Sequence, residues 1–183
     1  ITLFAACTAD AEQDANKKKR PSLKVSNQMI RIKMPGESYS GQLPDMTKQQ
    51  VKVRDALRRD LARLAGVIGE RNLNNPENYA AAALFIEKSL TDVGYNVERQ
   101  VYRVGGQSCM NLSVVVAGDE RADEIVVVGG HYDSLTGTPG ANDNGSGVVA
   151  TLALARMFAK RKPARTLRLA FFANEESPYF QTE

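Results

Sequence analysis

Two apolar runs in the second half of the chain constrain its fold more than any other feature. Residues 125–128 read Ile-Val-Val-Val without a polar break, and residues 166–173 form another apolar stretch. Unbroken runs of this kind favour strands that are covered on both faces, so we expect 125–128 to lie in a central strand. The segment between them, 148–160, is rich in Ala and Leu and predicts a helix. Strand, helix and strand in this order predict a layered α/β fold.

Two further helices are predicted before these strands. Thr47 opens a capping box with the Gln three residues later, and Leu and Ile recur at helical intervals over residues 57–68. A second helix begins at Asn75-Pro76, because Asn is a good N-cap and Pro suits the first turn. Gly94 is placed to end that helix.

Two more strands are predicted at 95–104 and 112–116, joined by a Gly-Gly turn. The whole pattern predicts a three-layer α/β fold with a central, mostly parallel mixed sheet flanked by helices. In such sheets, ligands bind outside the carboxyl ends of the strands. His131 and residues 174–176 both follow a predicted strand directly, so we expect the functional site there.

The first 46 residues differ in character from the rest. Residues 1–7 read Ile-Thr-Leu-Phe-Ala-Ala-Cys, and a polar stretch of low periodicity follows. This resembles the end of a bacterial lipoprotein signal peptide, with Cys7 as the lipidated residue; the alternative is a chance Cys in a frayed terminus. We predict a signal-peptide remnant and polar linker over residues 1–46 and a folded domain over 47–183.

Charge and cysteine content limit the partners. The net charge of +3 is too small to indicate nucleic-acid binding, and the basic run 17–20 is interpreted as a solvated linker. No apolar run approaches the ~18 residues of a membrane span. Two cysteines cannot form a disulfide framework, and Cys109 is expected to be buried. We therefore expect an exported protein, either a periplasmic or cell-surface lipoprotein or a secreted protein, with a lipid anchor at Cys7 as its only membrane contact.

Three short segments carry the residues that suggest catalysis. They are Gly-Gly-His-Tyr-Asp-Ser at 129–134, Gly-Ala-Asn-Asp-Asn-Gly-Ser-Gly at 140–147 and Asn-Glu-Glu at 174–176. Each has an ordinary structural explanation by itself, since a lone His is often structural, an Asp before a helix often caps it and adjacent Glu residues are often solvated. Their expected position at one edge of one sheet favours a shared site instead.

These residue types suit a metal-dependent hydrolase. A di-zinc site needs nitrogen and carboxylate ligands, one carboxylate that bridges the metals, and a base beside the metal-bound water. His131, the single histidine, offers an imidazole nitrogen, and Asp133 could hold its other ring nitrogen. Asp143 precedes a helix whose dipole favours an ionised carboxylate, which suits a bridging ligand. Glu175 and Glu176 are adjacent, so their side chains diverge if the backbone stays extended.

At these residues the chain resembles family twenty-eight of the metallopeptidases, the di-zinc aminopeptidases and their relatives, which include aminopeptidase Y and the glutamate carboxypeptidases. The resemblance runs from about residue 50 to Glu183. The motifs that carry it are Gly-Gly-His131-Tyr-Asp133-Ser, Gly-Ala-Asn-Asp143-Asn-Gly-Ser-Gly and Asn-Glu175-Glu176. It implies a zinc exopeptidase-like fold, of which residues 47–183 would be the N-terminal portion.

The resemblance also implies a role for each residue and peptides as substrates. His131 would bind one zinc ion, Asp143 would bridge two, and Glu176 would bind the other. Glu175 would be the general base and acid, and Asp133 would support His131. An aminopeptidase is favoured over a carboxypeptidase because that activity is the commoner one in the family.

One departure from the family pattern is plain. The family supplies two further metal ligands later in the chain, an Asp and a His, and no histidine follows His131 here. We therefore interpret the 183 residues as a truncated piece. Alone, it is expected to be inactive and poorly folded, with an open apolar edge on its sheet. Robust peptidase activity from these 183 residues would contradict that expectation.

Two alternatives stay open at this stage. A single-zinc glutaminyl-peptide cyclotransferase is similar in the His-Tyr-Asp-Ser and acidic segments, although the run around Asp143 is more similar to the peptidases. Pyroglutamate formation from an N-terminal Gln peptide would separate the two. A non-catalytic binding domain, as in receptor relatives of the family, would be expected to lose ligands, and here every ligand position within the covered region is intact.

Overall fold

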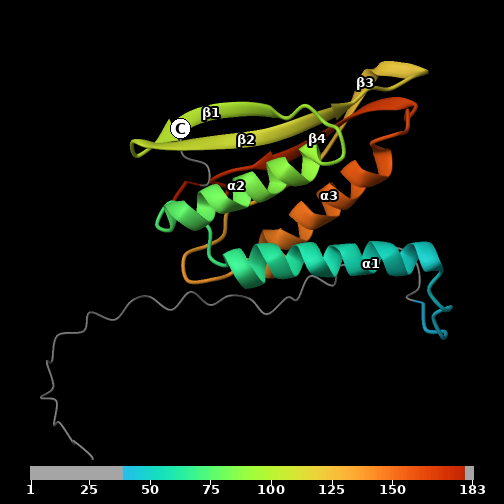
Figure 1. Ribbon diagram of the computed structural model, residues 1–183, viewed down its shortest axis with the longest axis horizontal. Coiled ribbons are helices and arrows are strands. Elements are labelled where there is room, and N and C mark those ends of the chain that lie inside the picture. The colour runs from blue at the N-terminus through green and yellow to red at the C-terminus, as the bar shows by residue number, and fades with distance from the viewer. Residues whose placement is uncertain (1–38, 180–183) are drawn as a thin grey trace, which may run out of the picture. The chain divides into compact units, whose positions relative to one another are not determined.

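The computed structural model describes residues 39–179 (Figure 1). The chain divides into two compact units, residues 1–43 and 44–183, and all elements below belong to the second. Cys7 and nearly all of the predicted linker lie outside the described residues, so lipidation stays a prediction. No helix among residues 39–179 is long and apolar enough to cross a membrane.

The first helix begins where the capping box predicts. Helix α1 spans Lys48–Leu61 and continues as a π-helical segment over Ala62–Ile68. The Thr47 hydroxyl accepts the Gln50 N–H at 3.2 Å, and the Gln50 side chain accepts the Thr47 N–H at 2.7 Å. These reciprocal bonds satisfy two backbone donors that a helix start otherwise leaves unpaired.

The second helix, α2, spans Pro76–Thr91. Asn75 occupies the N-cap position, although its side chain makes no capping hydrogen bond. The predicted glycine follows shortly after the last helical residue, Thr91, and turns the chain away, because Gly94 adopts a φ of 95°, a conformation that costs Gly little. The Tyr95 N–H then donates to the Leu90 carbonyl at 3.2 Å, which closes the last turn.

Four strands form one mixed sheet in the order β1-β2-β4-β3. They are β1 (Glu98–Val104), β2 (Gln107–Val116), β3 (Arg121–His131) and β4 (Arg165–Phe172). Only β3 and β4 are parallel, while β1 pairs with β2 and β2 with β4 antiparallel. The expected mostly parallel sheet is therefore wrong for the described residues. The reason is local, because the Gly105-Gly106 turn makes a hairpin and only the β3–β4 connection contains a crossover helix.

That crossover helix, α3, spans Gly147–Phe158. Figure 1 shows α1, α2 and α3 on the same face of the sheet. The expected flanking by helices on both faces is thus not found within residues 39–179. The opposite face exposes Val115 and Val127, which share a register row with Arg168 between them.

The apolar strand 121–131 lies at the edge of this sheet and not at its centre. Ile125 is 60% exposed and Val127 is 58% exposed. An unbroken apolar run indicates a strand but cannot specify which neighbours cover it, and β4 is its only partner among the described strands. The central position was therefore predicted wrongly, whereas the predicted open apolar edge is present.

The core fills the space between the helices and the sheet. Leu112, Leu169 and Phe171 of the sheet are fully buried against Ile86 and other apolar side chains of the helices. Each such side chain stabilises the fold by about 1.5–3 kcal/mol relative to exposure. Cys109 is a free, buried thiol, as predicted.

Candidate active site

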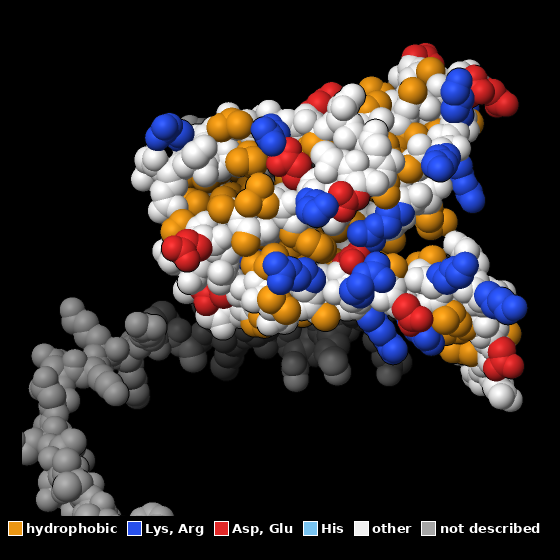
Figure 2. All heavy atoms as spheres, viewed as in Figure 1, with side chains coloured by type: hydrophobic (Ala, Val, Ile, Leu, Met, Phe, Trp, Pro, Cys, Tyr) orange, Lys and Arg blue, Asp and Glu red, His pale blue; other side chains and the backbone are white. Residues whose placement is uncertain are grey.

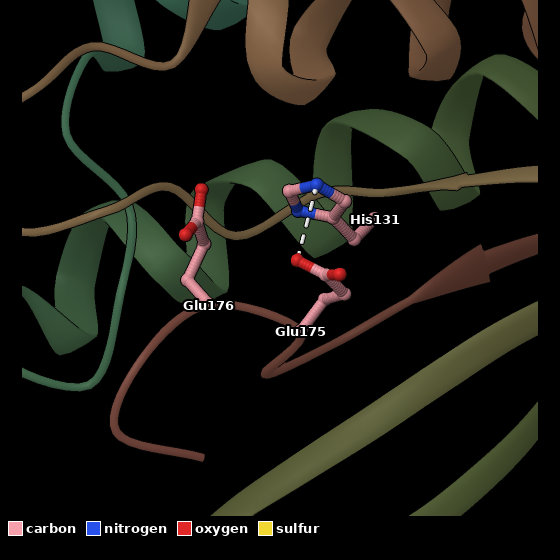
Figure 3. Close-up of side chains that lie close together, drawn as sticks. All are labelled: His131, Glu175 and Glu176. Atoms are coloured by element: carbon pink, nitrogen blue, oxygen red, sulfur yellow. Dashed lines mark ion pairs between the residues drawn. The ribbon is translucent and has the colours of Figure 1, made fainter. Parts of the chain in front are cut away.

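Two parallel strand ends bring the predicted site residues together. His131 is the last residue of β3 and pairs with Phe172, the last residue of β4. Because the carboxyl ends of parallel strands meet at one edge, Glu175 and Glu176 follow β4 directly beside His131. Figure 3 shows the three side chains pointing to a common space.

The His131 ring is 8% exposed and contacts carboxylates through both nitrogens. Its Nε2 lies 2.9 Å from Oδ1 of Asp143 and 3.5 Å from Oε2 of Glu175. Its Nδ1 lies 3.4 Å from Oδ1 of Asp133 and 3.3 Å from the Asp133 carbonyl oxygen. The structure therefore places Asp133 beside Nδ1, which leaves Nε2 directed at the exposed carboxylates.

Asp133 also organises the loop after β4. Its Oδ1 accepts the Glu175 N–H at 3.2 Å, and its Oδ2 accepts the Glu176 N–H at 3.0 Å. Burial raises the pKa of Asp133, but the hydrogen bonds from His131 and these two amides outweigh it and hold the pKa below its usual value. One buried carboxylate thus positions the imidazole and both glutamates.

Asn174 turns the chain at the end of β4. Its φ of 60° lies in the left-handed region, which Asn tolerates better than most residues. The Asn174 Oδ1 accepts the Tyr79 hydroxyl at 3.2 Å, and its Nδ2 donates to the Tyr102 hydroxyl at 3.3 Å. After this turn the side chains of the two glutamates do not diverge as expected. One oxygen of each lies within 4.8 Å of the other and of a His131 ring nitrogen.

The glycine-rich loop delivers Asp143 from the opposite side. Asp143 lies in the segment Ala141–Ser146, directly before α3, and its side chain is 76% exposed. The segment begins at Gly140, whose φ is 51°. A Cβ there would lie 2.6 Å from Cβ of Ser134, so only glycine fits. Gly140 therefore lets this loop pack closely on Ser134, and Asp143 Oδ1 in the same loop lies 2.9 Å from Nε2 of His131.

The site carries more negative charge than its own residues can balance. Four carboxylates surround the single imidazole: Asp133, Asp143, Glu175 and Glu176. Burial lowers the pKa of His131, but Asp133, Asp143 and Glu175 together raise it to about 9. Burial and the charge of Asp143 raise the pKa of Glu176. A cation would relieve this repulsion, and imidazole nitrogen with carboxylate oxygen is the donor set that zinc accepts. The residues present therefore fit a zinc site.

All five residues predicted for the site within the described range lie together: His131, Asp133, Asp143, Glu175 and Glu176. Sequence reasoning included Asn174 in a motif without giving it a role, and it missed Arg71. Asn between a strand and an acidic pair is a recognisable signal for a left-handed turn. Arg71 offered no signal, because a charged residue in a polar segment predicts exposure.

One family model and several curated proteins match this sequence. The model of peptidase family M28 matches residues 111–180. The Escherichia coli K12 protein YfbL is 31% identical over 138 residues, which cover 70% of this chain and 42% of that protein. A probable zinc metalloprotease of Pyricularia oryzae is 42% identical over 74 residues, 36% of this chain and 15% of that protein. The chain spans less than half the length of these relatives.

Solved structures share the fold. The zinc aminopeptidase BSAP of Bacillus subtilis matches with a TM-score of 0.59 at 14% identity, over 67% of this chain and 61% of that one. Tannerella forsythia glutaminyl cyclase matches with a TM-score of 0.56 at 23% identity, over 70% and 50%. Both likenesses support a zinc exopeptidase-like α/β fold.

The family match begins in β2 and ends after Glu176, so it contains every residue of the cluster around His131. Each of the three motifs singled out in the sequence lies inside the matched segment. Over residues 111–180 the chain is therefore similar to peptidase family M28, and its fold agrees with that similarity.

Proposed function

We propose that this chain carries one part of a zinc-dependent exopeptidase, an aminopeptidase that removes N-terminal residues from peptides. One observation carries the proposal: four carboxylates converge on one imidazole at the carboxyl ends of two parallel strands. The name of the Pyricularia relative supports zinc and proteolysis, and the aminopeptidase BSAP supports the finer assignment.

Two zinc ions are proposed, held in part by residues of this chain. His131 would bind one ion, Asp143 would bridge both, and Glu176 would bind the other. Zinc bound there would lower the pKa of a coordinated water toward ~7 and polarise the scissile carbonyl. Asp133 holds the His131 ring through Nδ1, which directs Nε2 at the carboxylates of Asp143 and Glu175, where the metal would bind.

Glu175 is the proposed general base. Its side chain is 47% exposed, and its Oε2 lies 3.5 Å from the His131 Nε2, so it borders both solvent and the metal position. In the proposed reaction Glu175 Oε2 takes a proton from the attacking water and later gives it to the leaving amine. The Glu175 amide is held by Asp133, which limits the movement of this base.

Replacing Glu175 tests this role. Glu175→Gln should lower kcat of the full chain about 10²- to 10⁴-fold, because the amide cannot accept the proton. The zinc content should be unchanged. Glu120→Gln, at an exposed position in the turn between β2 and β3, is the matched control and should keep full activity. Undiminished activity of Glu175→Gln would remove Glu175 as the base.

A glutaminyl cyclase is the second candidate, because cyclases share this fold with similar TM-scores, such as 0.57 for the Fimbriiglobus ruber enzyme. A peptide with N-terminal Gln distinguishes the two activities. An aminopeptidase releases free Gln and shortens the peptide by one residue. A cyclase releases ammonia and converts the N-terminal Gln to pyroglutamate, so the peptide keeps its number of residues. Mass spectrometry of the products decides between them.

The substrates, the export and the zinc binding of the full chain are further proposals. Peptides are the proposed substrates, and export with a lipid anchor at Cys7 stays a proposal. A non-catalytic binding domain would give a full chain that binds no zinc, which equilibrium dialysis measures.

A further inference from the structure

Arg71 is a fully buried arginine in the loop between the π-helical segment and α2. Its exposed fraction is 0%. Its guanidinium donates to four backbone carbonyl groups and uses all three of its nitrogens. Nε donates to Tyr132 at 2.6 Å and Nη2 to Gly140 at 2.8 Å, while Nη1 donates to Gly69 at 3.1 Å and to Pro139. Among residues 39–179, no other buried Lys or Arg side chain donates hydrogen bonds only to backbone carbonyl groups.

Two of the segments that Arg71 joins carry the metal-site residues. Tyr132 lies between His131 and Asp133, so the Nε bond fixes the peptide that orients both. Gly140 begins the loop that delivers Asp143. One planar guanidinium thus holds both segments. The His131 Nε2 and the Asp143 Oδ1, one from each segment, lie 2.9 Å apart.

The main chain of Arg71 strengthens the same connection. Its N–H donates to Oγ of Ser134 at 3.1 Å, and its carbonyl accepts the Ser134 N–H at 3.0 Å. Ser134 follows Asp133 directly, and its hydroxyl donates in turn to the Thr138 carbonyl at 3.0 Å. Residues 131–140 are therefore anchored to Arg71 at several points along their length.

The charge of Arg71 also fits the site. It forms no ion pair with a carboxylate within residues 39–179. Burial lowers its pKa to about 10, and the charge of Asp133 opposes this shift, so the group stays charged at neutral pH. A buried charge that only held a loop would be costly compared with neutral donors. Beside the carboxylate cluster it offsets part of the negative charge.

We propose that Arg71 is a positioning residue of the metal site, which sets the spacing of His131 and Asp143 for zinc through the carbonyl groups of Tyr132 and Gly140. This inference rests on the proposed zinc function. Arginine is required because its donors have a fixed planar geometry, whereas a lysine ammonium is a single point that cannot reach all of these carbonyls at once.

Arg71→Lys in the full chain tests the proposal, with Arg156→Lys as the matched control. Arg156 is a partly buried arginine that pairs with Asp60 within the helix layer. Zinc affinity is measured by competition with a chromophoric chelator, and the geometry of the site by the visible spectrum of the cobalt-loaded protein. Thermal unfolding of the zinc-free protein reports on the fold separately.

We expect Arg71→Lys to weaken zinc binding about 10- to 100-fold and to alter the cobalt spectrum, as for other groups that orient metal ligands. Arg156→Lys should change neither. If Arg71→Lys lowers only the unfolding temperature and leaves affinity and spectrum unchanged, Arg71 is a purely structural residue and the inference is overturned. If the unaltered chain binds no zinc, the proposed function fails together with this inference.

A second measurement needs no variant and covers the case in which Arg71→Lys does not fold. Zinc binding to the unaltered chain should slow hydrogen exchange of the Ser134 amide, which donates to Arg71, and of the Gly145 amide, which donates to Gly140. The Asp119 amide, which donates to Pro163 in a distant turn, should not respond. Unchanged exchange at Ser134 and Gly145 would contradict the proposed link.

Discussion

Two buried acidic groups of this molecule differ in how their charge is balanced. Asp60 in the helix layer is 4% exposed and pairs with Arg156, and Arg59 approaches its other oxygen at 3.6 Å. Asp133 at the sheet edge is 2% exposed, and its partners are one imidazole and two backbone amides. Charge at Asp60 is neutralised within the protein, whereas charge around Asp133 is not.

The difference distinguishes a structural ion pair from the proposed metal site. A paired buried carboxylate contributes to one conformation of the fold and needs no ligand. Several carboxylates around one imidazole repel each other and shift each other's pKa values, which is typical of sites that bind a cation or carry out acid–base chemistry. The comparison therefore predicts that substitutions in the two regions affect different measurements.

The largest expected effect is on metal binding at the sheet edge. Asp143→Asn removes a charged ligand while its neighbours remain, so zinc affinity of the full chain should fall by more than about 100-fold, beyond the loss from groups that only orient ligands. Competition with a chelator measures this. Asp60→Asn is the control. Equal losses of zinc affinity in both variants would contradict the distinction between the Asp60 pair and the carboxylates around His131.

A smaller effect is expected in the helix layer, and on stability alone. Asp60→Asn keeps the size of the side chain but weakens its bonds to Arg156 and Arg59, so the free energy of unfolding should fall by about 1.5–3 kcal/mol. Urea denaturation of the zinc-free protein measures the change. A loss of peptidase activity without a loss of stability would contradict a structural role for this pair.

The smallest effect concerns two tyrosines, one from each region. Tyr102→Phe removes a hydroxyl that donates to Ala173 at 2.8 Å and accepts from Asn174, and Tyr95→Phe removes a hydroxyl that donates to Ala155 at 2.9 Å. Each should lower the free energy of unfolding by about 0.5–1.5 kcal/mol. Only Tyr102→Phe should also weaken zinc binding, because it loosens the turn before Glu175. An equal effect on zinc from Tyr95→Phe would count against this difference.

The sequence was sufficient to predict the helices and strands, and to single out the residues that lie together around His131, but not the order of the strands in the sheet. Capping residues and apolar periodicity are local signals, and they located α1 from Thr47 and the end of α2 at Gly94. Strand order depends on which strands find each other in space, and the run at 125–128 gave no information on that. Its edge position could therefore not be predicted from apolar residues alone.

The site shows the same division. His131 and the acidic residues were predictable because their chemistry is specific and each follows a strand or precedes a helix. The convergence of Glu175 and Glu176 was not, because it depends on the left-handed turn at Asn174 and on amides that reach Asp133. The contacts of Arg71 join segments more than 60 residues apart in sequence, which no local pattern contains.

The most direct test of the central claim is a crystal structure of the full chain grown with zinc, with diffraction recorded on both sides of the zinc absorption edge. We expect an anomalous peak about 2.0–2.1 Å from Nε2 of His131, with carboxylate oxygens of Asp143 or Glu176 beside it. Density at these side chains without an anomalous peak, or a peak bound only elsewhere, would contradict a zinc site at the carboxyl ends of β3 and β4.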